Sequence, residues 1–354
     1  RVLKPTADLC DAPILAKEIA DAISALPTGK SPGPDRLPCR FYKTFSETIA
    51  LILHKVYEES IANNELHDTC LEGLISVLYK KGVKDDPRNY RPISLLNCDY
   101  KIFTRILTQR MNLAVLQFVS PQQTGFVQHS FIAENLMLLK LLQAKIEEED
   151  EEAIYLFLDM EKAYDRCSWS YLKSSLTHLG FGDNFIKYVS LFYNESKPPK
   201  RKICINGHTG EPFELHSGVA QGCPLSSVLF LCITEALTRL VQHDPNIIGV
   251  ETNGVRHKIS QFADDTTLIA KPPDLPHMQK HLDTWCEATG MKENMNKREG
   301  LLLGRLRRLI FSAPKNIVPN WTPDGTPIRA LGVPMGNRLD EEDWWHKRYR
   351  LVKT

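Results

Sequence analysis

The order of apolar and polar residues along the chain predicts a mixture of helices and strands. Apolar positions three and four residues apart are typical of amphipathic helices. Ile49, Ile52, Leu53 and Val56, for example, would form one apolar stripe on a helix. The same spacing predicts helices over residues 12–26, 102–118, 134–146, 168–179, 184–193 and 275–289, and a long helix that ends near residue 243.

Apolar and β-prone runs predict strands at four places. Residues 71–79 have the composition of a strand, and residues 154–158 are five consecutive apolar residues, as in a buried strand. Residues 201–215 predict a hairpin that turns at Asn206 and Gly207, because Asn-Gly is a favoured two-residue turn. Residues 259–270 predict a second hairpin with two acidic residues at its tip.

Those two acidic residues, Asp264 and Asp265, lie side by side between apolar, β-prone neighbours. Two like charges on a buried turn do not add stability, because each disfavours ionisation of the other. One interpretation is a solvated turn, in which Asp is common. The other is a platform for a divalent metal ion, which requires a third carboxylate at the end of another strand. Asp159 directly follows the apolar run 154–158 and meets that requirement.

The three carboxylates suit one type of reaction. Phosphoryl transfer with two metal ions needs carboxylates from separate strands that converge on ions about 4 Å apart. Mg²⁺ prefers hard oxygen ligands, commonly one or two carboxylates together with substrate phosphates. If their strands are neighbours, Asp159, Asp264 and Asp265 would fill these positions. One ion would lower the pKa of an attacking 3′-hydroxyl, and the other would hold a triphosphate and stabilise the leaving pyrophosphate.

Positive charge is concentrated between residues 76 and 110. The formal net charge of the whole chain, +1, makes no case for or against nucleic acid. This stretch, however, contains only three Asp residues against eight basic ones, which are Lys80, Lys81, Lys84, Arg88, Arg91, Lys101, Arg105 and Arg110. A phosphate-rich partner would bind there. The alternative is a solvated helix face and loop.

The composition argues against several other classes of protein. The chain has 354 residues, 42% hydrophobic and 25% charged, as in an ordinary globular protein of two or three sub-domains. Its nine cysteines include no CxxC pair, which argues against a zinc site or a disulfide framework and for an intracellular compartment. The segment 29–31 (GKS) is not a P-loop, because Ser24 stands where that motif needs glycine.

The ends of the chain and its apolar runs predict neither secretion nor a membrane span. No signal peptide opens the chain. The most apolar run, residues 225–237, is too short to span a bilayer and contains Glu235. The chain begins without methionine and stops inside a basic, Trp-rich segment, so we expect it to be an excerpt of a longer protein.

Several segments, in one consistent order, resemble the motifs of reverse transcriptases. Residues 158–165 (LDMEKAYD) look like motif A, 221–226 (QGCPLS) like motif B, and 262–265 (FADD) like motif C. Residues 89–95 (NYRPISL) resemble the motif of the fingers. Similarity to the non-LTR (LINE-type) retrotransposon branch extends to residues 29–35 (GKSPGPD), 123–126 (QTGF) and 331–333 (LGV).

This resemblance implies a fold and a catalytic set. The fold would be the α+β right-hand polymerase fold, with fingers and a palm built on an antiparallel sheet, and with the thumb largely missing. Asp159, Asp264 and Asp265 match the metal-binding carboxylates of the family, with Mg²⁺ as the expected cofactor and Mn²⁺ as its substitute. Lys297, in the segment 290–297 (GMKENMNK), matches the motif D lysine, a candidate general acid to pyrophosphate. A solvated surface lysine is the alternative.

Further positions match residues that hold the nucleotide. Tyr164 matches the steric gate of the family, whose ring fills the space of a ribose 2′-hydroxyl and so favours dNTPs. The alternative for Tyr164 is a packing tyrosine. Arg91, with Lys80 or Lys81, matches the fingers positions that bind the triphosphate, a task suited to bidentate Arg. Gln221 and Gly222 match the motif B positions that lie along the nucleotide and template.

Three positions depart from the family pattern. Ala220 fills the position before Gln221 that is often Arg, which bears on contacts with the template. Arg36 stands where the loop 29–35 is usually followed by a second Gly, which bears on the conformation of that loop. Arg298 replaces the usual small hydroxyl residue after Lys297, which bears on the assignment of motif D.

The resemblance also implies domains and partners. Residues 1–60 would be a helical N-terminal extension, 61–335 the reverse transcriptase domain with fingers and palm, and 336–354 the start of a thumb or connection. The function would be that of an RNA-directed DNA polymerase domain of a non-LTR retrotransposon. The expected partners are an RNA template, a DNA primer or target and dNTPs, without a membrane and with the oligomeric state open. The expected location is intracellular, in the nucleus during integration.

Two rival functions share part of this pattern. A catalytically silent retroelement remnant would bind nucleic acid only as a scaffold, but the presence of all three Asp residues and of Tyr164 argues against it. An RNA-dependent RNA polymerase shares the carboxylates of the palm. Tyr164 and the fingers motif argue against this second rival.

Overall fold

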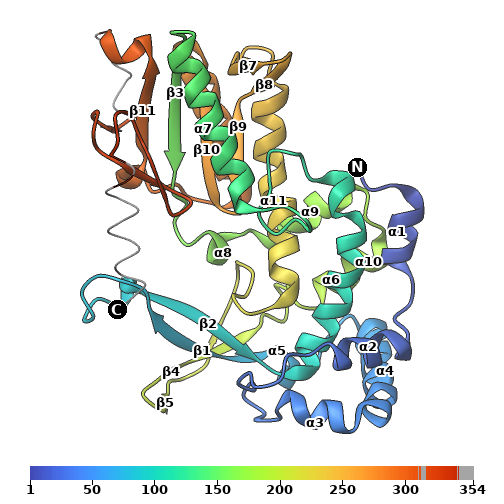
Figure 1. Ribbon diagram of the computed structural model, residues 1–354. Coiled ribbons are helices and arrows are strands. Elements are labelled where there is room, and N and C mark those ends of the chain that lie inside the picture. Colours follow the sequence, from blue (N-terminus) through green and yellow to red (C-terminus); the bar gives the residue numbers. More distant parts are fainter. Residues whose placement is uncertain (310, 312–315, 341, 343–354) are drawn as a thin grey trace. The chain divides into compact units, whose positions relative to one another are not determined.

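The chain forms two compact units in the computed structural model (Figure 1), which describes residues 1–309, 311, 316–340 and 342. The first unit consists of Arg1–Phe118 and Tyr164–Ile233, and the second of Val119–Ala163 and Thr234–Thr354. Each unit therefore combines two separate stretches of the chain. Most of the predicted thumb segment, residues 336–354, lies outside the described residues.

The predicted helices are present, with ends that differ from the prediction. The helices are α1 Lys4–Asp11, α2 Ala16–Ser24, α3 Cys39–Thr44, α4 Ser46–Asn63, α5 Asp68–Leu71, α6 Cys98–Phe118, α7 Ile132–Glu148, α8 Ala163–Arg166, α9 Trp169–Leu179, α10 Asp183–Ser190, α11 Pro224–His243 and α12 Leu275–Thr289. The start predicted at residue 12 is wrong. Ala12 precedes Pro13 and has the extended backbone that this position favours, so the helix begins only at Ala16.

Arg110 of α6 holds the N-terminal segment in place. Its side chain is buried, and its guanidinium donates to the carbonyl oxygens of Cys10 (3.0 Å) and Pro13 (2.8 Å) and to the carboxylate of Glu18 (2.7 Å). The prediction that Arg110 contributes to a phosphate-binding surface is therefore wrong, because the sequence pattern did not show that this cation is buried and already hydrogen-bonded.

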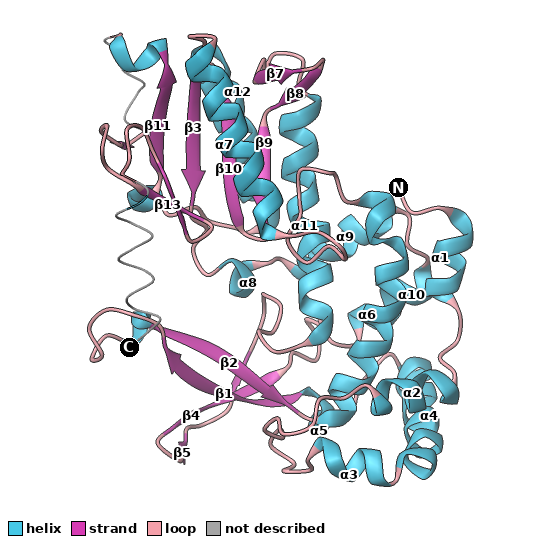
Figure 2. Cartoon of the chain, viewed as in Figure 1, coloured by secondary structure: helices cyan, strands magenta, loops and turns pink. Residues whose placement is uncertain are grey.

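The first unit contains a five-stranded sheet (Figure 2). Its strands are β1 Glu72–Tyr79, β2 Tyr90–Leu96, β4 Lys200–Ile205, β5 His208–Thr209 and β6 Phe213–Glu214. β1 pairs with β2 antiparallel and with β4 in parallel. The predicted hairpin after β4 is confirmed: Asn206 and Gly207 have positive φ values of 51° and 83°, as its two-residue turn requires.

The second unit is built on another five-stranded sheet, in the order β12-β11-β3-β10-β9. These strands are β12 Asn320–Trp321, β11 Glu299–Gly304, β3 Glu152–Leu158, β10 Asp265–Ala270 and β9 Ile259–Phe262. All neighbours except β11 and β12 are antiparallel. This is the antiparallel sheet that was predicted for the palm. Two small hairpins, β7 Val250–Thr252 with β8 Val255–His257 and β13 Ile328–Ala330 with β14 Val333–Met335, complete the unit.

Helix α7 covers one face of the second sheet (Figure 1). Its buried residues Leu139, Leu142 and Ile146 form a core with side chains of β3, β10 and β11, including Tyr155 and Ile269. The Tyr155 hydroxyl, buried in this core, donates a hydrogen bond to the Leu139 carbonyl at 2.8 Å. Because a buried hydroxyl without a partner is costly, this bond fixes the helix against the central strand.

Helix α11 is longer than the apolar run suggested. The run 225–237 is only part of this helix, and in the described part of the chain only α11 has the length and composition to cross a membrane. Most of the apolar part of α11 is buried inside the protein, however. Glu235 is also buried and accepts hydrogen bonds from the Ser120 N–H (2.9 Å) and from Arg239 (2.7 Å). These features are typical of a core helix.

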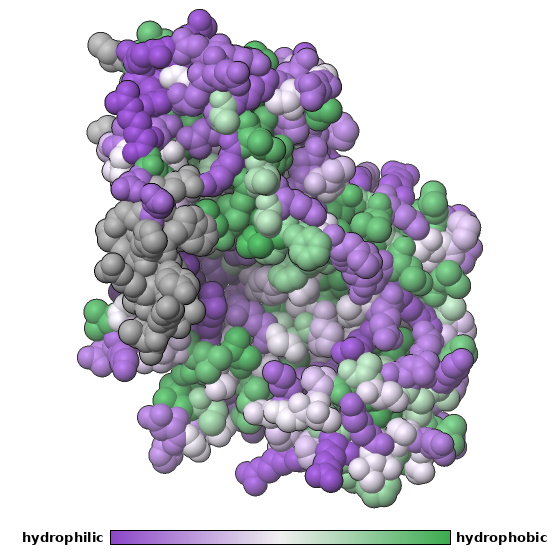
Figure 3. Space-filling view, viewed as in Figure 1, coloured by the Kyte–Doolittle hydropathy of each residue, from purple (hydrophilic) through white to green (hydrophobic). Residues whose placement is uncertain are grey.

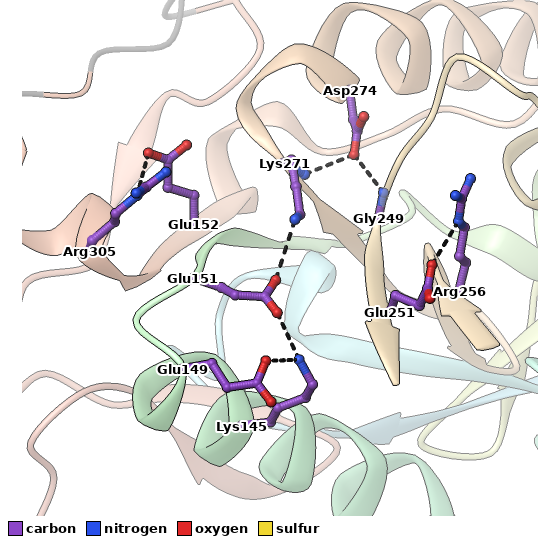
Figure 4. Close-up of polar contacts among 10 residues, drawn as sticks. All are labelled: Lys145, Glu149, Glu151, Glu152, Gly249, Glu251, Arg256, Lys271, Asp274 and Arg305. Carbon is purple, nitrogen blue, oxygen red and sulfur yellow. Dashed lines mark hydrogen bonds and ion pairs between the residues drawn. The ribbon is translucent and has the colours of Figure 1, made fainter. Parts of the chain in front are cut away.

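Charged side chains pair at the end of the second sheet where β3 begins (Figure 4). The carboxylate of Glu151 lies 2.7 Å from the Lys145 ammonium and 3.3 Å from that of Lys271, and Arg305 pairs with Glu152 at 2.7 Å. The hydrogen bond from Lys145 holds the pKa of Glu151 below its usual value. Glu151, Glu152, Lys271 and Arg305 line a pocket of about 400 Å³, and the surface at this end of the second unit is mostly hydrophilic (Figure 3). Because these cations already have carboxylate partners, the network serves to join the strand ends.

Candidate active site

Three carboxylates lie at the opposite end of the second sheet. β3 and β10 are neighbours, and Leu158 pairs with Thr266 in their antiparallel register. Asp159 immediately follows Leu158 and Asp265 immediately precedes Thr266, so the two aspartates continue the ladder at the same end. The condition stated above for a shared metal site, that the strands of Asp159 and of the Asp264–Asp265 pair are neighbours, is therefore met.

The turn that carries Asp264 is as short as a hairpin turn can be. Phe262 pairs with Asp265, so Ala263 and Asp264 are its two central residues. The predicted hairpin is confirmed, but only Asp264 lies at its tip, because Asp265 is already the first residue of β10. Ala263 has a φ of 57°, in the left-handed region that is unfavourable for a residue with a Cβ atom.

Lys297 lies next to the first carboxylate. Its ammonium donates to Oδ2 of Asp159 at 2.8 Å. The backbone holds this geometry, since the Asn294 N–H donates to the Asp159 carbonyl at 2.8 Å and the Lys297 N–H to the Asn294 carbonyl at 2.9 Å. The predicted motif D lysine and the predicted motif A aspartate are thus in direct contact.

Arg298 anchors the loop that carries Lys297. Its side chain is 1% exposed, and its guanidinium donates to the Glu293 carboxylate (2.6 Å), to Gln279 of α12 (2.6 Å) and to the Ile317 carbonyl (2.5 Å). A small hydroxyl residue at this position would leave these partners unpaired. The departure from the family pattern at Arg298 is therefore part of how this loop is held in place.

The donor chemistry of the site fits a hard divalent cation. Asp159, Asp264 and Asp265 offer carboxylate oxygens from two neighbouring strands, the type of ligand that Mg²⁺ and Mn²⁺ prefer. In the described part of the chain, no group of three acidic, His or Cys side chains is close enough together to hold a metal ion as it stands. Binding would therefore require these side chains to rotate.

The predicted triphosphate-binding residues lie on the sheet of the first unit. Arg91 of β2 pairs in register with Leu78 of β1, and both are exposed. The pairing of the two strands continues to Lys80, whose N–H donates to the Asn89 carbonyl at 2.8 Å. Because side chains two residues apart on a strand lie on the same face, Lys80 lies on the same face as Leu78 and its partner Arg91. Lys81 is also exposed but lies in the following turn. Arg91 and Lys80 thus form a cationic edge on one face of this sheet.

Motif B packs directly on the fingers strand β2 within the first unit. The Ser94 N–H donates to the Gln221 carbonyl at 2.8 Å. Gly222 has a φ of 117°, and a Cβ atom there would lie 2.5 Å from the Ser94 carbonyl oxygen. Only glycine permits this approach, which gives a physical reason for Gly222 in the motif.

Tyr164 is half-buried and packs on α11. Its ring stacks on that of Phe230, with centroids 4.9 Å apart and an angle of 10° between the planes. The Tyr164 carbonyl accepts the Val219 N–H at 2.7 Å, and Gly218 is so close that a Cβ atom there would lie 2.7 Å from the same carbonyl oxygen. The backbone of Tyr164 is thus held close to Gly218 and Val219 while its ring stacks on Phe230, an arrangement that suits both a steric gate and a packing tyrosine.

The site residues fall into the two units as follows. Asp159, Asp264, Asp265 and Lys297 belong to the second unit, while Tyr164, Arg91, Lys80, Lys81, Gln221 and Gly222 belong to the first. Sequence reasoning missed the roles of Arg298 and of Gln123, a buried residue next to the carboxylate hairpin. The only signal for either was the position of each within a motif-like segment.

Comparison with known proteins identifies the class. The family model described as "Reverse transcriptase (RNA-dependent DNA polymerase)" matches residues 79–335, which is well over half of the chain. The chain therefore belongs to the reverse transcriptase family, and the predicted α+β right-hand polymerase fold is the fold of that family. Among solved structures, apo telomerase from Candida tropicalis truncated from its C-terminal domain has a TM-score of 0.49 and 13% identity, over 81% of this chain and 59% of that one.

Individual relatives narrow the class to one branch. The chain is 32% identical over 332 residues to the "Transposon TX1 uncharacterized 149 kDa protein" of Xenopus laevis, covering 91% of this chain and 24% of that protein. It is 26% identical to the "Probable RNA-directed DNA polymerase from transposon BS" of Drosophila melanogaster, covering 92% of this chain and 36% of that protein. The chain is thus a reverse transcriptase of the non-LTR (LINE-type) branch, and it spans about a quarter to a third of the length of these relatives.

Proposed function

We propose that this domain adds dNTPs to a primer 3′-hydroxyl on an RNA template by two-metal phosphoryl transfer at the Asp159, Asp264 and Asp265 end of the second sheet. Carboxylates on two neighbouring strands, with a lysine beside them, support this role most directly. Bound Mg²⁺, or Mn²⁺ in its place, would supply the charge that activates the 3′-hydroxyl and stabilises the leaving pyrophosphate. The chain would hold these ions through its three aspartates.

Other residues of the chain would bind and select the nucleotide. Arg91, with Lys80 and Lys81, would bind the triphosphate, since exposed cations on a strand edge suit phosphate oxygens. Gln221 and Gly222 would lie along the nucleotide and template. Tyr164 would exclude a ribose 2′-hydroxyl, a role supported by the stacking of its ring on Phe230. Lys297 would donate a proton to pyrophosphate after its pairing with Asp159 opens.

The proposed partners are an RNA template, a DNA primer or target, and dNTPs. We place the protein in the intracellular compartment, and in the nucleus during integration. Nothing in the fold favours the rival role of a silent scaffold, because all three aspartates, Lys297 and Tyr164 are present in the described residues. The boundaries proposed above, with an N-terminal extension over residues 1–60 and a thumb from residue 336, belong to the same proposal.

Primer extension on an RNA template tests the proposal. The chain should incorporate dNTPs only when Mg²⁺ or Mn²⁺ is present, and Asp264→Ala should abolish the reaction. A matched control is Asp274→Ala, which removes another carboxylate of the same unit, one that accepts the Ile248 and Gly249 N–H groups. Equal activity of Asp264→Ala and the unaltered chain would exclude the metal role of this residue. Metal-independent incorporation would exclude the mechanism.

A further inference from the structure

The turn between β9 and β10 has a conformation that its own sequence does not favour. Ala263 adopts a φ of 57°, although glycine or asparagine would adopt this conformation at lower cost. A two-residue hairpin turn of this kind needs positive φ, and alanine provides no side-chain hydrogen bond to stabilise it. Some other part of the molecule must therefore hold Ala263 in place.

The side chain of Gln123 makes the required contacts. Its Oε1 accepts the Ala263 N–H at 2.8 Å, and its Nε2 donates to the Ala263 carbonyl at 3.1 Å. Both backbone polar groups of this one residue are thus satisfied by one side-chain amide. Oε1 also accepts the Gly125 N–H at 2.9 Å, which fixes the amide itself. Gln123 is 2% exposed, so these bonds form without competing water.

The segment that carries Gln123 is itself attached to β9. The Gln261 N–H donates to the Gln122 carbonyl at 2.8 Å, and the Thr124 N–H donates to the Gln261 carbonyl at 3.1 Å. Asn135 of α7 donates to the Gln261 carbonyl at 2.9 Å and to the Ser260 hydroxyl at 2.8 Å. Buried polar side chains therefore connect helix α7, this segment and the hairpin.

The close contact between Gly125 and the β9–β10 turn is independent evidence that the Gln123 segment fits against this turn. A Cβ atom at Gly125 would lie 2.1 Å from the Ala263 nitrogen and 2.8 Å from the Phe262 carbonyl carbon. Both atoms belong to the backbone and cannot move aside without moving the turn. The residue two positions after Gln123 must therefore be glycine for the amide to reach Ala263.

We propose that Gln123 is a positioning residue of the active site: its amide holds Ala263 in the left-handed conformation and thereby sets the direction of Asp264, the next residue. The inference rests on the proposed metal-binding role of Asp264. It deepens that role, because it explains how the backbone that carries the Asp264 carboxylate is held in a strained turn before any ion binds. In this role Gln123 acts through the backbone of Ala263.

The decisive variant is Gln123→Met, which keeps the length of the side chain and removes its hydrogen bonds. Without metal, the Ala263 amide should exchange with solvent at least about 10-fold faster, because its hydrogen-bond partner is gone. The affinity for Mn²⁺, measured by electron paramagnetic resonance, should fall about 10-fold, as for other residues that orient metal ligands. The double variant Gln123→Met with Ala263→Gly should recover most of that affinity, because glycine adopts positive φ without the hydrogen bonds from Gln123.

The control is Gln143→Met, which removes a half-buried glutamine of the same unit whose Nε2 donates to the Gly336 carbonyl at 2.9 Å. It should lower stability by a similar amount and leave Mn²⁺ affinity unchanged. Unchanged Ala263 exchange and Mn²⁺ affinity in Gln123→Met would overturn the proposal, and so would a loss of affinity that Ala263→Gly does not restore. If Asp264→Ala leaves Mn²⁺ binding intact, the metal role of Asp264 fails instead, and the exchange rate alone then decides whether Gln123 holds the turn.

Discussion

The ammonium group of Lys297 lies 2.8 Å from Oδ2 of Asp159, and the two side chains are 62% and 42% exposed. An ion pair this exposed contributes only about 0–1 kcal/mol to stability, so stability does not explain its position. The pair instead joins a candidate proton donor to a candidate metal ligand. A cation that binds Oδ2 of Asp159 would compete with Lys297, whose ammonium could then interact with a phosphate of the substrate.

The first prediction concerns this pair. Lys297→Met should change the free energy of unfolding by less than about 1 kcal/mol, yet slow nucleotide addition about 100-fold, because a general acid is lost. Urea unfolding and single-turnover incorporation measure the two effects. Lys292→Met is the matched control, since Lys292 pairs with Glu161 at 3.4 Å in the same loop. Equal rates in both variants would show that Lys297 is a solvated surface lysine and not the general acid.

The second prediction concerns sugar selection by Tyr164. Tyr164→Ala removes the ring that stacks on Phe230, so the incorporation of NTPs relative to dNTPs should rise at least about 10-fold, the equivalent of roughly 1.4 kcal/mol. Tyr164→Phe keeps the ring and should preserve discrimination. Competition between matched dNTP and NTP in primer extension gives the ratio. If discrimination survives in the alanine variant, Tyr164 is only a packing residue.

The sequence alone predicted those parts of the site that depend on local pattern. The apolar run before Asp159 and the β-prone residues around Asp264 defined two strand ends, and antiparallel pairing of their strands then brought the carboxylates together. The Asn206-Gly207 turn was equally predictable from the sequence, because two-residue turns have strong sequence preferences. In each case a few neighbouring residues carry the information.

The features that were missed depend on distant parts of the chain. The sequence pattern predicted a surface charge at Arg110, but its guanidinium is buried and donates to the carbonyl groups of Cys10 and Pro13. Arg298 appeared only as a departure from a motif, although it joins Glu293 to the Ile317 carbonyl. No local pattern distinguishes a solvated arginine from a buried one, because the difference lies in which elements pack around it.

The third prediction concerns acid stability. Burial raises the pKa of Glu18, but hydrogen bonds from Arg110 and the Leu15 N–H outweigh it, so the pKa is lower than the usual 4.5. Glu18 therefore stabilises the fold above pH 4.5, and this contribution is lost as the pH falls through the lower pKa of the folded state. Glu18→Gln should cost up to about 3 kcal/mol at pH 7, because the buried Arg110 loses its counter-ion.

Urea unfolding between pH 3 and pH 7 measures this effect. The difference in stability between the unaltered chain and Glu18→Gln should be largest near neutral pH and should shrink below about pH 4.5. Glu58→Gln is the control, because Glu58 pairs with His54 on the exposed surface of α4, and its effect should be small throughout. A difference for Glu18→Gln that does not change with pH would show that its pKa is the same in the folded and unfolded states.

The last prediction concerns Arg36, which replaces the second glycine of the family loop. Arg36 has a φ of 61°, so it adopts the glycine conformation at a cost, while its N–H donates to the Gly33 carbonyl at 3.1 Å. Because its side chain is exposed, Arg36→Gly should stabilise the fold by about 0.5–1 kcal/mol, measured as a higher urea midpoint. Asn64→Gly is the control: Asn64 has a φ of 55° after α4, and asparagine tolerates this conformation, so the gain there should be smaller. A loss of stability in Arg36→Gly would mean that contacts of the arginine side chain outweigh the strain of its backbone.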